Sequence, residues 1–110
     1  MLTPAATLKQ ALIAQGINVA VPWVLMASYL YYHRDTSILT DEQYDALVQA
    51  LRARWDRVEH RHKHLLAELI EGRSTTLYYL TEADYPTITR SAACQLAGIG
   101  YREPRTRKGR

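Results

Sequence analysis

The sequence predicts a mainly α-helical protein: a three-helix domain over residues 1–72 with a long third helix, then a small strand and helix extension over residues 73–101. Apolar residues recur at helical spacing through the first two thirds, and residues that favour helix starts precede two of these runs. After Gly72 the composition shifts toward β-branched and aromatic residues. The apolar fraction of 47% and charged fraction of 23% are typical of a globular protein with a compact core.

The first helix is predicted over about residues 4–15. Thr3 followed by Pro4 suits an N-cap and the first helical position. Leu8 and Leu12 then recur at helical spacing until Gly16, which favours a helix end.

The second helix is predicted to begin near Pro22, because proline is tolerated in a first turn, and to end near residues 33–35. Its apolar residues occupy most of the helix circumference, so we expect it in the middle of the bundle. They include Trp23, Val24, Met26, Ala27, Leu30 and Tyr31.

The third helix is predicted to begin at Asp41. Thr40 and Gln43 form a capping box, and the carboxylates of Asp41 and Glu42 favour the positive helix end. An apolar stripe then continues to Gly72, which implies a helix about 45 Å long. Since two shorter helices would not cover this length, we expect either a folded-back C-terminal segment or self-association into a homo-oligomer.

The extension after Gly72 is predicted to begin with a single strand over residues 74–80. A turn at residues 84–86 follows, and then a short helix over residues 87–97 closed by Gly98. Within that helix Cys94, the single cysteine, is expected to be a small buried apolar residue.

The positive charge of the chain is concentrated at its C-terminal end. Five cations against Glu103 give residues 102–110 a charge of +4, which leaves −1 for the rest of a chain whose net charge is +3. We expect a flexible basic tail that binds nucleic acid or an acidic protein surface, because neutralising phosphates requires no fold. The cations are Arg102, Arg105, Arg107, Lys108 and Arg110.

Several protein classes lack their sequence signatures here. The longest apolar run, residues 17–32, is shorter than the roughly 18–20 residues of a membrane span, and no signal-peptide pattern opens the chain. We therefore expect a cytoplasmic protein without membrane association. No Ser-His-Asp order, Walker-type loop or CxxC pair occurs, so we expect no enzyme activity.

The histidine-rich segment 60–64 contains side chains that can bind metal ions. In a continuous helix His60 and His64 would share a face with Asp56 and Glu68, at a spacing that suits zinc. A helix face of alternating charge is solvated far more often than metal-bound, so no metal is predicted.

The segment from residue 29 to residue 47 combines aromatic hydroxyls and carboxylates around one short loop. A tyrosine pair is followed by an aspartate, and after the loop an Asp-x-x-Tyr-Asp sequence opens the next helix. The residues of this pattern are Tyr31, Tyr32, Asp35, Asp41, Tyr44 and Asp45.

This pattern resembles the small helical segment that opens bacterial NAD-dependent DNA ligases and grips the nicotinamide half of NAD. The resemblance covers about residues 25–55 without an insertion. It implies that the Tyr31 ring stacks on the nicotinamide, and that the remaining site residues contact the ribose and phosphate. Those residues are Tyr32, Asp41, Tyr44 and Asp45.

The chain also departs from these ligases. The adenylated lysine of their Lys-x-Asp-Gly motif is absent, because Lys9, Lys63 and Lys108 lie in other contexts. The Ser-Pro-Thr segment that leads into the adenylation domain is absent as well. The resemblance therefore concerns the recognition domain alone.

Three functions follow as hypotheses. The first is a non-catalytic binding module that acts on nucleic acid, or on a protein of nucleic-acid metabolism, through the basic tail. The second is a structural or adaptor protein, such as a phage virion or host-interaction protein, which uses the helical hairpin for oligomerisation or docking. The third is a module that binds NAD or nicotinamide mononucleotide.

Overall fold

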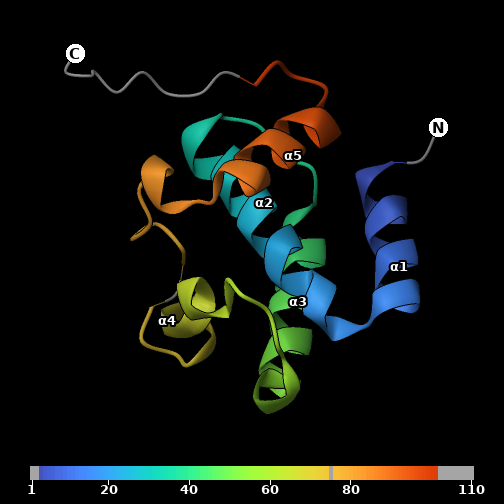
Figure 1. The fold of residues 1–110 in the computed structure, drawn as a ribbon, viewed down its shortest axis with the longest axis vertical. Coiled ribbons are helices and arrows are strands. Elements are labelled where there is room, and N and C mark those ends of the chain that lie inside the picture. The colour runs from blue at the N-terminus through green and yellow to red at the C-terminus, as the bar shows by residue number, and fades with distance from the viewer. Residues whose placement is uncertain (1–2, 75, 102–110) are drawn as a thin grey trace.

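The computed structural model describes residues 3–74 and 76–101, and this part of the chain is helical without a strand (Figure 1). Five α-helices are joined by short loops and by four short 3₁₀ segments. The α-helices are α1 (Pro4–Gln15), α2 (Ala20–His33), α3 (Asp41–Ala53), α4 (Ala67–Ile70) and α5 (Thr87–Ala97). The 3₁₀ segments are Ile17–Val19, Trp55–Arg57, Lys63–Leu66 and Glu82–Asp84.

Helix α2 lies at the centre of the fold, as its apolar circumference predicted. Helices α3 and α5 pack against it, whereas α1 lies to one side of this group (Figure 1). Ten of the eleven positions from residue 20 to residue 30 are buried, all except Pro22, so α2 has no solvent-exposed face before its last turn. They are Ala20, Val21, Trp23, Val24, Leu25, Met26, Ala27, Ser28, Tyr29 and Leu30.

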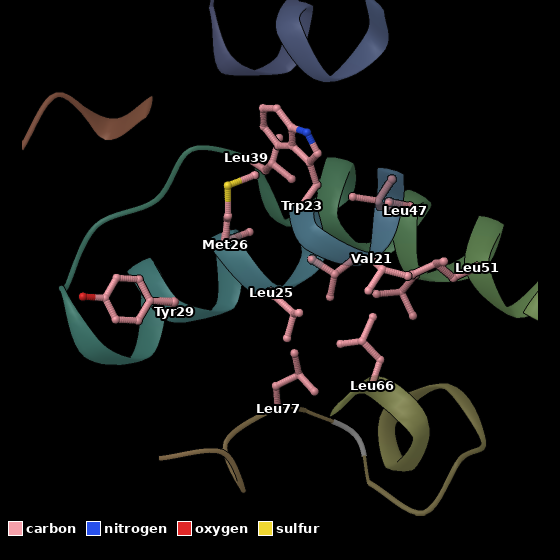
Figure 2. Close-up of a cluster of buried hydrophobic side chains, with 14 of the residues drawn as sticks. Val21, Trp23, Leu25, Met26, Tyr29, Leu39, Leu47, Leu51, Leu66 and Leu77 are labelled. Carbon is pink, nitrogen blue, oxygen red and sulfur yellow. The ribbon is translucent and has the colours of Figure 1, made fainter. Parts of the chain in front are cut away.

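The core surrounds α2 on several sides (Figure 2). Leu25 points toward Leu77 of the C-terminal extension, and Val21 lies near Leu66 and Leu51. Burial of each leucine side chain stabilises the fold by about 2 kcal/mol, so the extension contributes to the same core as the helices.

The helix starts form as the sequence predicted. The Thr3 hydroxyl accepts a hydrogen bond from the Ala6 amide at 3.1 Å, which caps α1. At α3 the Gln43 amide donates to the Thr40 hydroxyl at 3.1 Å, and the Thr40 amide donates to the Gln43 side chain at 2.8 Å. The predicted capping box is therefore confirmed.

Helix α2 ends in a left-handed residue that directs the following loop. Asp35 has φ of 54°, and the Thr36 amide donates to the Leu30 carbonyl at 3.1 Å. The Leu30 carbonyl also accepts from the Arg34 amide at 3.1 Å, so one carbonyl binds two amides at the helix end, and Asp35 takes a conformation for which glycine is the usual residue. The turn separates the tyrosine pair on α2 from the start of α3.

The predicted long third helix is wrong, because α3 ends at Ala53. The chain folds back after this point, and side-chain hydrogen bonds connect the segments that meet there: the Arg52 guanidinium donates to the carbonyls of Leu69 and Ile70, at 2.9 and 3.1 Å. The Asn18 side chain likewise accepts from the Glu59 amide at 2.8 Å. The chain turns back and covers its own apolar stripe, which removes the argument for self-association made from helix length.

The predicted strand over residues 74–80 does not form in the residues described there, which adopt turns instead. The Ser74 hydroxyl donates to the Thr76 carbonyl at 2.8 Å, and the Tyr78 amide donates to the Thr76 hydroxyl at 3.2 Å. Hydroxyl side chains that bond to nearby backbone compete with strand pairing. Leu77 and Leu80 are nevertheless buried, so the segment contributes to the core.

The predicted helix over residues 87–97 is confirmed as α5, with Gly98 in the left-handed conformation at its end. Cys94 is fully buried, as expected. Within residues 3–74 and 76–101, no helix has the length and apolar character needed to cross a membrane. The predicted basic tail, residues 102–110, lies outside the described residues.

Candidate functional site

A cavity of about 380 Å³, here called the tyrosine pocket, lies between the second half of α2 and the start of α3. Helix α2 supplies one wall, and the loop after Asp35 and the first turn of α3 supply the other. Its lining residues are Ala27, Ser28, Tyr31, Tyr32, Ser37, Leu39, Thr40, Asp41 and Tyr44.

The pocket brings together four of the five residues predicted to bind a nicotinamide nucleotide: Tyr31, Tyr32, Asp41 and Tyr44. Asp45 is exposed one helical turn beyond Asp41 and does not line the cavity. The spacing of the motif accounts for this grouping, because the left-handed turn at Asp35 folds α3 back beside α2.

Tyr44 and Ser28 form the polar part of the wall where α2 and α3 meet. Their hydroxyl oxygens lie 2.7 Å apart, and Ser28 is buried. Burial raises the pKa of the Tyr44 hydroxyl to about 12, although the hydrogen bond with Ser28 acts in the opposite direction. Tyr44 therefore keeps its proton at neutral pH and can donate a hydrogen bond.

Aromatic rings form the outer wall of the pocket. Tyr31 is 62% exposed, and its ring meets that of Tyr32 edge-on, with 5.0 Å between centroids and 83° between planes. The Tyr32 ring in turn meets the Tyr78 ring at 5.5 Å and 65°. Three tyrosines thus form a continuous aromatic edge, which offers flat surface for a planar ligand.

The electrostatic character of the pocket favours a cation. Asp41 supplies a carboxylate, and the residues that line the cavity include no lysine, arginine or histidine. Tyrosine faces attract cations through the ring quadrupole. The arrangement therefore suits a flat, positively charged ring better than an anionic group.

Sequence reasoning missed Ser28 and Tyr78. Ser28 is the one small hydroxyl residue in the buried part of α2, three positions before Tyr31, and this isolated polar residue was a usable signal. Tyr78 belongs to the predicted strand, and no sequence pattern placed its ring against Tyr32. That contact depends on how the extension folds over α2.

The histidine-rich segment does not form the cluster that the spacing of a continuous helix would give. Helix α3 ends before it, so Asp56, His60, His64 and Glu68 are not successive turns of one helix. The rings of His60 and His62 lie 5.4 Å apart. Within the described part of the chain, no group of three or more His, Cys, Asp or Glu residues is placed to hold a metal ion.

Comparisons with known proteins add no further functional assignment to the tyrosine pocket. No family model matches the chain, and no curated protein or solved structure matches it either.

Proposed function

We propose that this protein is a non-catalytic binding module, similar to the nicotinamide-recognising domain of NAD-dependent DNA ligases, and that the tyrosine pocket holds the nicotinamide ring of a nucleotide. The observation that carries the proposal is the grouping of Tyr31, Tyr32, Asp41 and Tyr44 around one cavity. The resemblance in sequence assigns these same positions to nicotinamide recognition.

The chemistry of the pocket supports a ribosylated nicotinamide. The oxidised ring is a planar cation, which matches the exposed face of Tyr31 and the carboxylate of Asp41. Asp41 can accept hydrogen bonds from ribose hydroxyls, and the protonated Tyr44 can donate to a ring amide. The cavity of about 380 Å³ falls within the range of small-molecule sites.

The module is proposed to bind the nucleotide without catalysing a reaction. The ligase lysine that receives AMP has no counterpart in the sequence, and the pocket wall offers tyrosine and serine hydroxyls and one carboxylate. These groups suit recognition of a ring and a ribose. No nucleophile paired with a general base is among them.

Binding is tested by titrating nicotinamide mononucleotide into isotope-labelled protein and following backbone amide signals. We expect shifts that concentrate at residues 27–32 and 37–44 and that saturate in the micromolar to low-millimolar range. Tyr31→Ala should abolish them. Ile88→Ala is the matched control, because Ile88 is also an exposed large side chain, 73% accessible, and does not line the pocket.

The charge of the ring provides a second criterion. Reduced nicotinamide mononucleotide has a neutral ring and should bind more weakly than the oxidised form. Unchanged spectra at several millimolar oxidised ligand would refute the proposal, and equal binding of both forms would refute the role given to Asp41 and the tyrosine faces.

A second candidate function, nucleic-acid binding through the basic tail, is favoured by the concentration of five cations in residues 102–110. A log–log salt slope near −4 on duplex DNA is expected if about four to five phosphates are neutralised. Replacing the five cations by glutamine should then reduce duplex binding to background. If the intact protein fails to bind DNA at about 50 mM salt, the adaptor hypothesis takes its place.

A further inference from the structure

A second cavity, here called the Trp55 cavity, lies where α3 ends and the chain turns back. Its volume is about 580 Å³, and the residues around it come from the last turn of α3 and the 3₁₀ segment that follows. Those that carry the argument are Arg52, Arg54, Trp55, Asp56 and Arg57. Three guanidinium groups and one carboxylate therefore share this surface.

The side chains of two of the three arginines add no hydrogen bond or ion pair to the described part of the fold. Arg52 is engaged, since its guanidinium donates to the carbonyls of Leu69 and Ile70. Arg54 and Arg57 are exposed, and their side chains make no hydrogen bond or ion pair with any residue that the structure describes. Their positive charges remain available to an external anion.

Trp55 is held in a fixed orientation beside these arginines. Its indole N–H donates to the Glu71 carboxylate at 3.3 Å, and the Lys63 ammonium lies 4.6 Å from the ring centroid. Lys63 also donates to the Trp55 carbonyl at 2.9 Å. Glu71 forms an ion pair with Arg73 at 2.6 Å, so its negative charge is compensated close to the ring.

We infer that the Trp55 cavity binds single-stranded nucleic acid. Guanidinium groups recognise phosphate through charge-assisted hydrogen bonds, and a fixed aromatic ring provides a surface on which an unpaired base can stack. Arg54 and Arg57 supply the guanidinium groups, and Trp55 supplies the ring face opposite the Lys63 ammonium, because Lys63 already covers one face. A duplex offers the phosphates but keeps its bases stacked on one another, so the combination favours a single strand.

The distribution of charge along α3 confines this surface to one end of the molecule. The first turns of α3 carry Asp41, Glu42 and Asp45, which repel phosphate, whereas its C-terminal end carries the arginines. The two ends are about 18 Å apart. The Trp55 cavity is therefore separate from the tyrosine pocket, and its function stands independently of nicotinamide binding.

The test measures binding of a fluorescein-labelled oligothymidylate to the full-length chain by anisotropy at about 50 mM salt. Arg54→Gln and Arg57→Gln should each weaken binding roughly five- to tenfold and reduce the salt slope by about 0.7. Lys9→Gln is the matched control, because it removes one exposed cation from α1 and should leave both values unchanged.

The role of Trp55 is followed through its fluorescence. The other tryptophan, Trp23, is 4% exposed, so quenching by the oligonucleotide should come from Trp55 and should disappear in Trp55→Phe. A variant in which the five cations of residues 102–110 are replaced by glutamine distinguishes binding by the Trp55 cavity from binding by the tail. It should still bind the single strand and still respond to Arg54→Gln.

Three outcomes would overturn the inference. The first is wild-type affinity and salt slope in the Arg54→Gln and Arg57→Gln variants, which would assign all binding to residues 102–110. The second is tighter binding of duplex than of single strand, and the third is equal competition by polyglutamate at the same charge, which would indicate an acidic protein as the partner.

Discussion

The Tyr85 side chain is fully buried, and its hydroxyl has no hydrogen-bond partner among the residues that the structure describes. The ring itself is well placed, with edge-on contacts to Tyr29 and His33 at centroid distances of 5.5 Å. An unpaired buried hydroxyl loses hydration without compensation, at a cost of about 1–3 kcal/mol. The benefit of this residue therefore comes from its ring.

Replacing Tyr85 by phenylalanine should leave the free energy of unfolding unchanged or raise it by about 1 kcal/mol. Tyr29 is the matched comparison, because it is equally buried but its hydroxyl accepts a hydrogen bond from Arg34 at 3.3 Å. Tyr29→Phe should lower stability by about 1 kcal/mol. Urea unfolding measures both, and a loss of 2 kcal/mol or so in Tyr85→Phe would show that the hydroxyl has a partner.

The hydroxyl of Tyr44 makes the fold sensitive to alkali. Burial holds its folded-state pKa at about 12, above the value of about 10 in an unfolded chain. Below pH 10 both states keep the proton; as the pH rises from about 10 to about 12 only the unfolded state releases it, so stability falls across that window. The loss from this group can reach about 3 kcal/mol.

Denaturant unfolding on either side of this window should show the decline, and Tyr44→Phe should reduce it. Tyr31→Phe, which removes an exposed hydroxyl, is the control and should retain the full decline. An identical pH dependence in Tyr44→Phe and the unmodified protein would contradict the assignment.

At the scale of the elements, helix starts were easier to predict than helix ends. Thr3 and Thr40 mark the starts of α1 and α3 through hydrogen bonds to residues three positions away, and these local bonds are visible in the sequence. The end of α3 depends instead on partners such as Leu69 and Asn18, which are distant in the chain. Apolar periodicity continues past Ala53, so the local sequence contains no signal that the helix ends there.

At the tyrosine pocket too, some contacts could be predicted from the local sequence and others could not. The motif spacing was sufficient to group the residues of α2 and α3, because both lie next to a single turn at Asp35. The neighbouring Tyr78 and the basic surface around Trp55 depend on the fold-back after Ala53. Both became visible only once the course of the chain was known.

The role of Arg52 in this fold-back can be tested directly. Arg52→Gln should destabilise the protein by about 1–3 kcal/mol, because the backbone carbonyls of Leu69 and Ile70, at the end of α4, lose a charged hydrogen-bond donor. Arg54→Gln is the matched control two positions away and should change stability by less than about 0.5 kcal/mol. Thermal and urea unfolding give both values, and equal stability of the two variants would contradict this explanation of the turn.

At the scale of the whole molecule, the apolar stripe that follows α3 is covered within one chain. Leu66, Leu69 and Ile70 are buried against the core formed around α2. We therefore expect a monomer in light scattering at high micromolar concentration, with slow amide exchange at Leu66 and Leu69. A stable dimer would instead point to the exposed edge of α1, where Ile13 is 79% accessible, and Ile13→Glu would then dissociate it.

The central position of α2 determines how small a working version of this protein can be. Residues 20–53 contain every side chain that lines the tyrosine pocket, so this hairpin looks like a portable unit. Yet Leu25 of α2, which does not line the pocket, faces Leu77 (Figure 2), and α5 packs along the same helix. A gene fragment ending after Ala53 would encode the whole pocket wall but expose the apolar surface of α2 that the C-terminal half covers. The pocket and the C-terminal half must therefore be inherited, transplanted or engineered together.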